Sequence, residues 1–271
     1  MKKAFVLFCG LSTFALAETA DTVPLKIDIS QLPPQSKLID NVVVPVPSEI
    51  FGVLDRLGKP NWTAVLRTFK RPIKPSGDQS QIALLLGTVI AEGFIAVEAE
   101  NAEEVKKIGN NVLILSKSLN ADRKAKQRAQ SISEAADRKD WQTVRRELDK
   151  ALDDVKETMV EMQSEQISQL VSLGGWLRGT EALTAVVTND FKPDGAELLH
   201  QPMLLDYFEK RLANMPTKIK SNAVVTKVQQ GILEIRPLVG TVDGTQISEK
   251  TVKEIGRISA DLVKAINAKA Q

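Results

Sequence analysis

Residues 172–184 read SLGGWLRGTEALT, a run in which three glycines interrupt an otherwise apolar, helical pattern. A phosphate-binding loop places such glycines between a strand and the start of a helix, and a lysine with a serine or threonine follows them. Here the preceding residues 166–173 already have a helical pattern, and no such lysine follows. The stretch therefore predicts a central helix, not a nucleotide site.

A helical wheel separates the residues of this stretch by chemistry. At about 100° per residue, Gly175 and Gly179 lie roughly 40° apart, while Arg178 and Glu181 share one narrow polar stripe. A glycine inside a helix costs about 1 kcal/mol, so we expect a neighbouring helix to approach closely at Gly175 and Gly179. Replacing either glycine by leucine should then destabilise the protein by overpacking.

The partner expected at this crossing is the apolar run IALLLGTVIAEGFIAV at residues 82–97. It carries its own small pair, Gly87 and Ala91, and one carboxylate, Glu92. A buried carboxylate must be paired or protonated, so Glu92 either has a basic or hydroxyl partner or lines a functional cavity. Sixteen residues with a central Glu92 are short and costly for a membrane span, which takes roughly 20.

The N-terminal residues MKKAFVLFCGLSTFALAE have the three parts of a secretory signal peptide. Lys2 and Lys3 precede an apolar stretch that ends in Ala15-Leu16-Ala17, which predicts cleavage after Ala17. We therefore expect residues 1–17 to be removed and the protein to be periplasmic or secreted, with no transmembrane segment left. Cys9, the single cysteine, lies in this segment, so the mature protein would have no disulfide and no thiolate site.

Residues 18–47 are rich in proline and β-branched side chains and lack helical periodicity. Prolines forbid a regular helix and favour extended chain, so this segment is expected to form an extended arm along the folded body. Residues 48–271 should form one all-helical domain. Capping sequences at Asp78 and Asn101 predict helix starts, and regularly spaced apolar residues after Val105 and Trp141 predict amphipathic helices.

The predicted fold class is all-α, an antiparallel helical bundle or a short α-α stack with a C-terminal helical hairpin at residues 216–268. A weak similarity between NWTAVLR at residues 61–67 and DWQTVRR at residues 140–146 suggests two related units. Their bounds would be 48–120 and 139–213, and each would contain one small-faced helix. Few positions match, so a chance likeness stays open.

Charge and composition narrow the possible functions. Without Lys2 and Lys3 the chain has 34 basic and 34 acidic residues, so nothing in the overall charge directs it to nucleic acid. The basic run Arg123, Lys124, Lys126 and Arg128 is better explained as a solvated helix face. A single histidine, His200, and the lack of other ligand clusters indicate no metal site and no cofactor.

Three functions remain open. The first is a soluble exported binding or scaffolding protein of the periplasm or cell envelope, with another envelope protein as partner. The second is a carrier of a small apolar ligand or lipid, in a cavity between the two central helices. The third is a hydrolase that uses Glu92 and Glu181, although three tryptophans and one tyrosine are few for a sugar cleft. The candidate ligand-binding residues are Glu92, Trp176, Arg178 and Glu181; the sequence assigns no catalytic residue.

Overall fold

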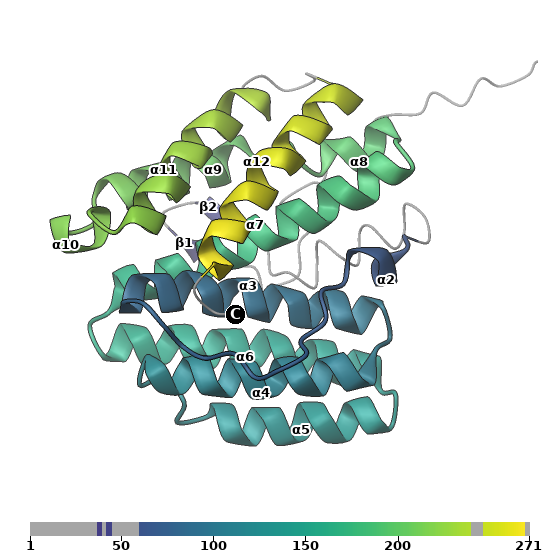
Figure 1. Cartoon of the computed structure of the whole chain (residues 1–271), viewed down its shortest axis with the longest axis vertical. Helices are drawn as coiled ribbons and strands as arrows, with labels where there is room; N and C mark the ends of the chain where they lie inside the picture. Colours follow the sequence, from purple (N-terminus) through teal and green to yellow (C-terminus); the bar gives the residue numbers. More distant parts are fainter. Residues whose placement is uncertain (1–36, 40–41, 45–59, 240–245, 269–271) are drawn as a thin grey trace, which may run out of the picture.

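The computed structural model describes residues 37–39, 42–44, 60–239 and 246–268, and nearly all of them are helical (Figure 1). The predicted all-α class is confirmed, with the addition of one small two-stranded sheet. The expected signal peptide and most of the arm lie outside the described residues. The elements are β1 (Lys37–Ile39), β2 (Val42–Val44), α2 (Trp62–Val65), α3 (Gln79–Glu98), α4 (Ala102–Ser118), α5 (Ala125–Asp137), α6 (Trp141–Glu161), α7 (Glu165–Asn189), α8 (Pro193–Glu197), α9 (Pro202–Ala213), α10 (Thr217–Lys220), α11 (Ala223–Ile235), the 3-10 turn η2 (Arg236–Leu238) and α12 (Glu249–Asn267).

Helices α3, α4, α5 and α6 close into a four-helix bundle. Each packs on the next along the chain, and α6 returns to pack against α3. Connections of only a few residues make successive helices antiparallel neighbours. The predicted capping residues Asp78 and Asn101 start α3 and α4, because their side chains accept hydrogen bonds from the backbone N–H groups of Gln81 and Glu104 at 3.0 Å.

A second group of helices lies on the other side of α3. Helix α7 packs extensively on α3, α12 packs on α7, and α11 packs on α12 and α9. Figure 1 shows α4, α5 and α6 below α3, with α9, α11 and α12 above α7. The C-terminal hairpin predicted at residues 216–268 corresponds to α10, α11 and α12. The two related units predicted at 48–120 and 139–213 stay a prediction.

Helix α3 is enclosed because it belongs to both groups. Every residue from Ser80 to Val97 is buried. Gln79–Glu98 is the one described helix long and apolar enough to cross a membrane, yet its most apolar stretch lies wholly inside the protein. Its composition is therefore explained by neighbours on all sides, which is the position of a core helix.

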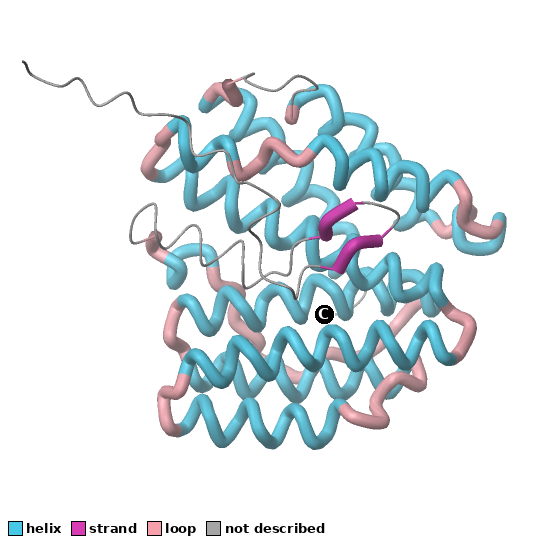
Figure 2. The backbone as a smooth tube through the Cα atoms, turned by 180° about the vertical axis from the view of Figure 1, so that it is seen from behind, coloured by secondary structure: helices cyan, strands magenta, loops and turns pink. Residues whose placement is uncertain are grey.

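The described part of the arm is extended, as predicted. β1 and β2 pair antiparallel, with Leu38 opposite Val43. Strand β2 packs beside α9, and Figure 2 shows both strands next to the upper group of helices. This part of the arm therefore lies along the folded body.

Candidate functional site

Arg178 and Glu92 form a buried ion pair where α7 crosses α3. Both side chains are 2% exposed. The Arg178 guanidinium donates from Nε to Glu92 Oε2 at 2.6 Å and from Nη2 to Glu92 Oε1 at 3.1 Å. Two parallel hydrogen bonds of this kind fix the relative orientation of the planar groups. Of the two alternatives that the sequence left open for Glu92, the structure therefore shows the basic partner.

Glu181 joins the pair from one helical turn further along α7. Its Oε2 accepts from Arg178 Nη1 at 3.3 Å, and its Oε1 accepts from Arg67 Nη2 at 2.5 Å. The Glu181 side chain is 15% exposed. The polar stripe predicted on α7 thus faces other charged groups at the edge of the core.

Arg67 is the residue of this cluster that the sequence did not identify as a site residue. It follows α2, and its backbone N–H donates to Glu92 Oε1 at 2.6 Å. Burial, and then the positive charge of Arg178, lower the pKa of Arg67, while Glu181 and Glu92 oppose that shift. Arg67 is the last residue of NWTAVLR, and in the sequence it stood out only as a position that matches DWQTVRR in the possible internal repeat.

The cluster of Arg67, Glu92, Arg178 and Glu181 is closed. All four carboxylate oxygens accept a hydrogen bond, and Arg178 Nη2 also donates to the backbone carbonyl of Val65 at 2.6 Å. A general acid or base needs one oxygen that can reach a substrate. This geometry instead holds the start of the helical body together.

The segment after α2 is fixed by further side chains of the bundle. The backbone N–H of Phe69 donates to Glu104 Oε2, and that of Ile73 donates to Asn111 Oδ1, each at 3.0 Å. Glu104 and Asn111 lie two turns apart on α4 and are both buried. Residues 66–75, which we name the strap, are therefore held to α4 through their backbone N–H groups. Figure 1 shows the strap as an extended trace that runs across the four-helix bundle.

Trp176 lies away from the charged cluster. Its indole Nε1 donates to Gln201 Oε1 at 3.0 Å, and its ring lies 5.7 Å from that of Phe208 on α9. On α7 it points to the side opposite Arg178. The structure thus brings together three of the four predicted residues and places Trp176 in the α7–α9 contact. His200 precedes Gln201, and its buried Nδ1 has no partner among the described residues.

The predicted close crossing of α7 with residues 82–97 exists, and Gly87 lies in it as predicted, but the sequence placed the α7 glycine one residue wrongly. A Cβ added at Gly87 would lie 2.0 Å from the Val171 carbonyl oxygen, and one at Gly174 would lie 2.1 Å from that of Leu84. Gly175 has only an ordinary contact, 3.5 Å from the Gly87 carbonyl oxygen. A Cβ at Gly179 would meet no described atom within 4 Å. Gly174, not Gly175 or Gly179, is therefore the glycine of α7 that the crossing requires.

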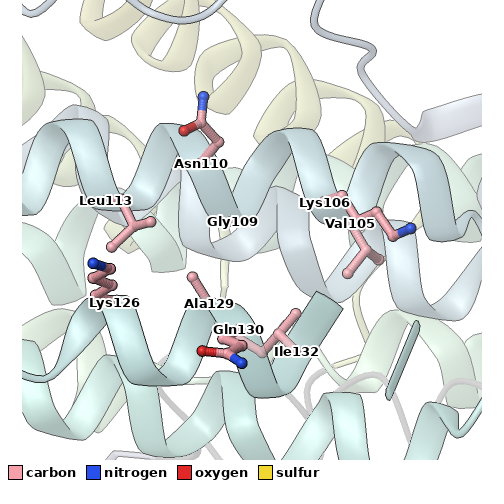
Figure 3. Close-up of a pocket in the computed structure, with 9 residues that line it drawn as sticks. All are labelled: Val105, Lys106, Gly109, Asn110, Leu113, Lys126, Ala129, Gln130 and Ile132. Atoms are coloured by element: carbon pink, nitrogen blue, oxygen red, sulfur yellow. The ribbon is translucent and has the colours of Figure 1, made fainter. Parts of the chain in front are cut away.

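A shallow groove lies between α4 and α5, with a volume of about 270 Å³ (Figure 3). Its walls are mostly apolar and include Val105, Leu113, Ala129 and Ile132. Gly109 lies at its centre, and Lys126 stands beside Leu113 at one end. The sequence did not single out this groove, because its walls come from two helices with separate apolar stripes.

The described residues contain no cluster of three or more His, Cys, Asp and Glu side chains that could hold a metal ion. Comparison with protein-family models, curated proteins and solved structures finds no match to this chain. The function must therefore be argued from the geometry alone.

Proposed function

We propose that this chain is an exported, helical binding or scaffolding protein of the periplasm or cell envelope. The observation that carries the proposal is the closed cluster of Arg67, Glu92, Arg178 and Glu181. The polar groups that would serve a reaction bind one another and the backbone of the strap. A closed cluster of this kind fixes α3, α7 and the strap to one another, which favours a rigid protein that binds a partner through its surface.

The signal-like N-terminus adds the cellular context. A chain with a cleavable leader and no cysteine after it must be stabilised by its core, without disulfides. The large cluster of buried apolar side chains that spans both helix groups is consistent with that requirement. Export and partner binding are proposals that rest on the sequence and on this core together.

The carrier alternative receives less support at the crossing of α3 and α7. A ligand between these helices needs a gap, but their backbones meet at Gly87 and Gly174. The hydrolase alternative needs Glu92 and Glu181 to be accessible, but every oxygen of both is occupied. We therefore retain the binding or scaffolding function as the conclusion.

Fractionation of a bacterium with a double membrane tests export. A C-terminally tagged chain should appear in the periplasmic fraction with the mass expected after loss of residues 1–17. The Ala17→Arg variant should keep the leader, because a small residue is needed at the cleavage site. A wild-type chain of full mass in the cytoplasm would contradict the proposal.

Native mass spectrometry of the protein isolated from its own envelope tests the binding function. A protein partner in a fixed ratio would support it. A lipid or metabolite bound in a fixed ratio would favour the carrier alternative instead. A chain recovered alone, after mild chemical cross-linking, would contradict both.

A further inference from the structure

The strap carries positive charge that the rest of the protein does not neutralise. Residues 60–77 contain four basic and no acidic side chains. Of the four, Arg67 binds Glu181 in the closed cluster. The other three, Lys70, Arg71 and Lys74, are exposed, and none of them pairs with a carboxylate in the part of the chain that the structure describes.

The acidic side chains that adjoin the strap are already in use. Glu92 and Glu104 accept hydrogen bonds from its backbone, and Glu104 also binds Lys107 at 2.8 Å. Asp78, the first acidic residue after the strap, caps α3 and accepts a hydrogen bond from Asn222 at 2.8 Å. The three exposed cations of the strap therefore lack a counter-charge from these neighbours.

The backbone that carries these cations is fixed in place. Its N–H groups at Phe69 and Ile73 bind buried side chains of α4, and the Ile73 side chain is 6% exposed. Pro72 and Pro75 further restrict the chain, because the proline ring fixes φ. Figure 1 shows the resulting extended trace across the bundle. A partner that binds here does not have to order the strap, which lowers the cost of association.

We propose that the strap binds an acidic segment of a partner protein, whose carboxylates pair with Lys70, Arg71 and Lys74. Charge complementarity carries the inference: three cations without counter-charges are presented on one ordered, extended chain. The inference rests on the proposed binding function and names the surface and the chemistry of the partner.

The composition of the strap favours an acidic polypeptide over an anionic membrane. Basic clusters that recognise anionic lipids usually contain four to eight Lys and Arg residues, and the strap has three that are available. Membrane binding is also strengthened by apolar side chains that enter the lipid. The large apolar side chains that are exposed among the described residues are Val160, Met162, Met203 and Leu233, all outside the strap.

The spacing of the cations predicts the pattern of the partner. Lys70 and Lys74 are four residues apart, so in an extended chain their Cα atoms lie about 13 Å apart. Acidic residues at i and i+4 of an extended partner segment span the same distance. A third carboxylate between them can bind the Arg71 guanidinium through two parallel hydrogen bonds. We therefore expect three Asp or Glu residues within five positions.

The probe for this surface is a fluorescein-labelled peptide of twelve residues in which Glu and Ser alternate. Fluorescence anisotropy should show saturable binding to the purified exported protein, and the same peptide with Gln in place of Glu should not bind. The triple variant Lys70→Gln, Arg71→Gln, Lys74→Gln should bind the Glu peptide at least tenfold more weakly than the wild type does. Binding should also weaken as the salt concentration rises, because exposed ion pairs are screened.

A second triple variant controls for the loss of total charge. Lys126→Gln, Arg138→Gln, Lys250→Gln removes two lysines and one arginine that are also exposed but lie outside the strap. This variant should bind the Glu peptide as the wild type does. Melting temperatures establish that both triple variants are folded.

Three outcomes overturn the strap proposal. Equal weakening in both triple variants would show that total charge, not the strap, determines binding. Absence of peptide binding to the wild type removes the strap as an acidic-segment site, while native mass spectrometry still tests the general binding function separately. Binding to phosphatidylglycerol vesicles that the strap variant loses, without peptide binding, would make the occupant a membrane.

Discussion

Alanine at Gly87 or Gly174 should destabilise the protein, although alanine is the better helix former. In an open helix the change from glycine to alanine gains about 1 kcal/mol. Here the new methyl group would lie 2.0 Å from a backbone oxygen at Gly87 and 2.1 Å from one at Gly174. Real Cβ contacts are essentially never shorter than 3.0 Å, so α3 and α7 would have to separate by about 1 Å.

That separation sets the expected size of the effect. A gap of 0.5 to 1 Å loses about a quarter to a half of each dispersion contact across the crossing. Overpacking of cores typically costs about 1 to 3 kcal/mol, and a clash with backbone belongs at the upper end. We expect a loss of about 3 kcal/mol, which lowers the melting temperature of a chain of this size by roughly 6 to 12 °C.

The assay is thermal and urea unfolding followed by circular dichroism. Gly109→Ala and Gly179→Ala are the matched controls, because no described atom lies within 4 Å of the added Cβ. They should be as stable as the wild type or up to about 1 kcal/mol more stable. A Gly87→Ala or Gly174→Ala variant with an unchanged melting temperature would refute the close-crossing argument.

Three further predictions follow from the buried polar groups. Arg178→Met should cost about 3 to 5 kcal/mol in denaturant unfolding, because it leaves Glu92 buried without its charge partner. Arg257→Gln, which removes exposed ion pairs with Glu254 and Asp261, should cost much less than Arg178→Met, and equal effects of the two variants would show that burial is not the cause. Hydrogen exchange should show protected amides at Arg67, Phe69 and Ile73 although they lie outside any helix, because buried side chains accept hydrogen bonds from them. Glu104→Ala should remove the protection at Phe69. Rapid exchange of the Phe69 amide in the wild type would disprove the account of the strap. Burial raises the pKa values of Glu147 and Asp154, but hydrogen bonds outweigh it and hold both pKa values below their usual range. The donors are Lys150 and Arg128 for Glu147, and Arg128 and Lys124 for Asp154. Because the folded-state pKa values are lowered, their stabilisation is complete at neutral pH and is lost as the pH falls below roughly 4. Arg128→Gln raises those pKa values, so it should move the midpoint of acid unfolding to higher pH; an unchanged midpoint would contradict the assignment.

Local patterns in the sequence were sufficient to predict that the chain is helical and where α3 and α4 begin. The capping side chains at Asp78 and Asn101 and the apolar stripes depend on residues within one or two turns, so they are visible without the fold. The same holds for the polar stripe of Arg178 and Glu181, and for the expectation that Glu92 is either paired or part of a cavity. The chemistry of one buried carboxylate could thus be predicted from its neighbours in sequence.

Contacts between distant segments could not be predicted in this way. Arg67 is 114 residues from Glu181, and nothing in either local sequence indicates their pairing. The strap is equally hidden, because its backbone amides bind side chains of helices that follow it. The wrong choice of Gly175 and Gly179 in place of Gly174 has the same origin. A helical wheel gives the angular positions of residues around one helix, but it does not give the direction from which a neighbouring helix approaches.

The sequence by itself determined an all-helical chain with a signal-like start, one apolar central helix and a few charged groups that had to be paired. Those properties follow from periodicity, capping and the cost of burying charge, all of which act over short distances along the chain. Only the tertiary structure decided that Gly174 is the glycine of α7 that meets Gly87, that Arg67 joins Glu92, Arg178 and Glu181, and that this charged cluster is closed. Each of these depends on the rotation and separation of packed helices, which are set by the sum of contacts over the whole core.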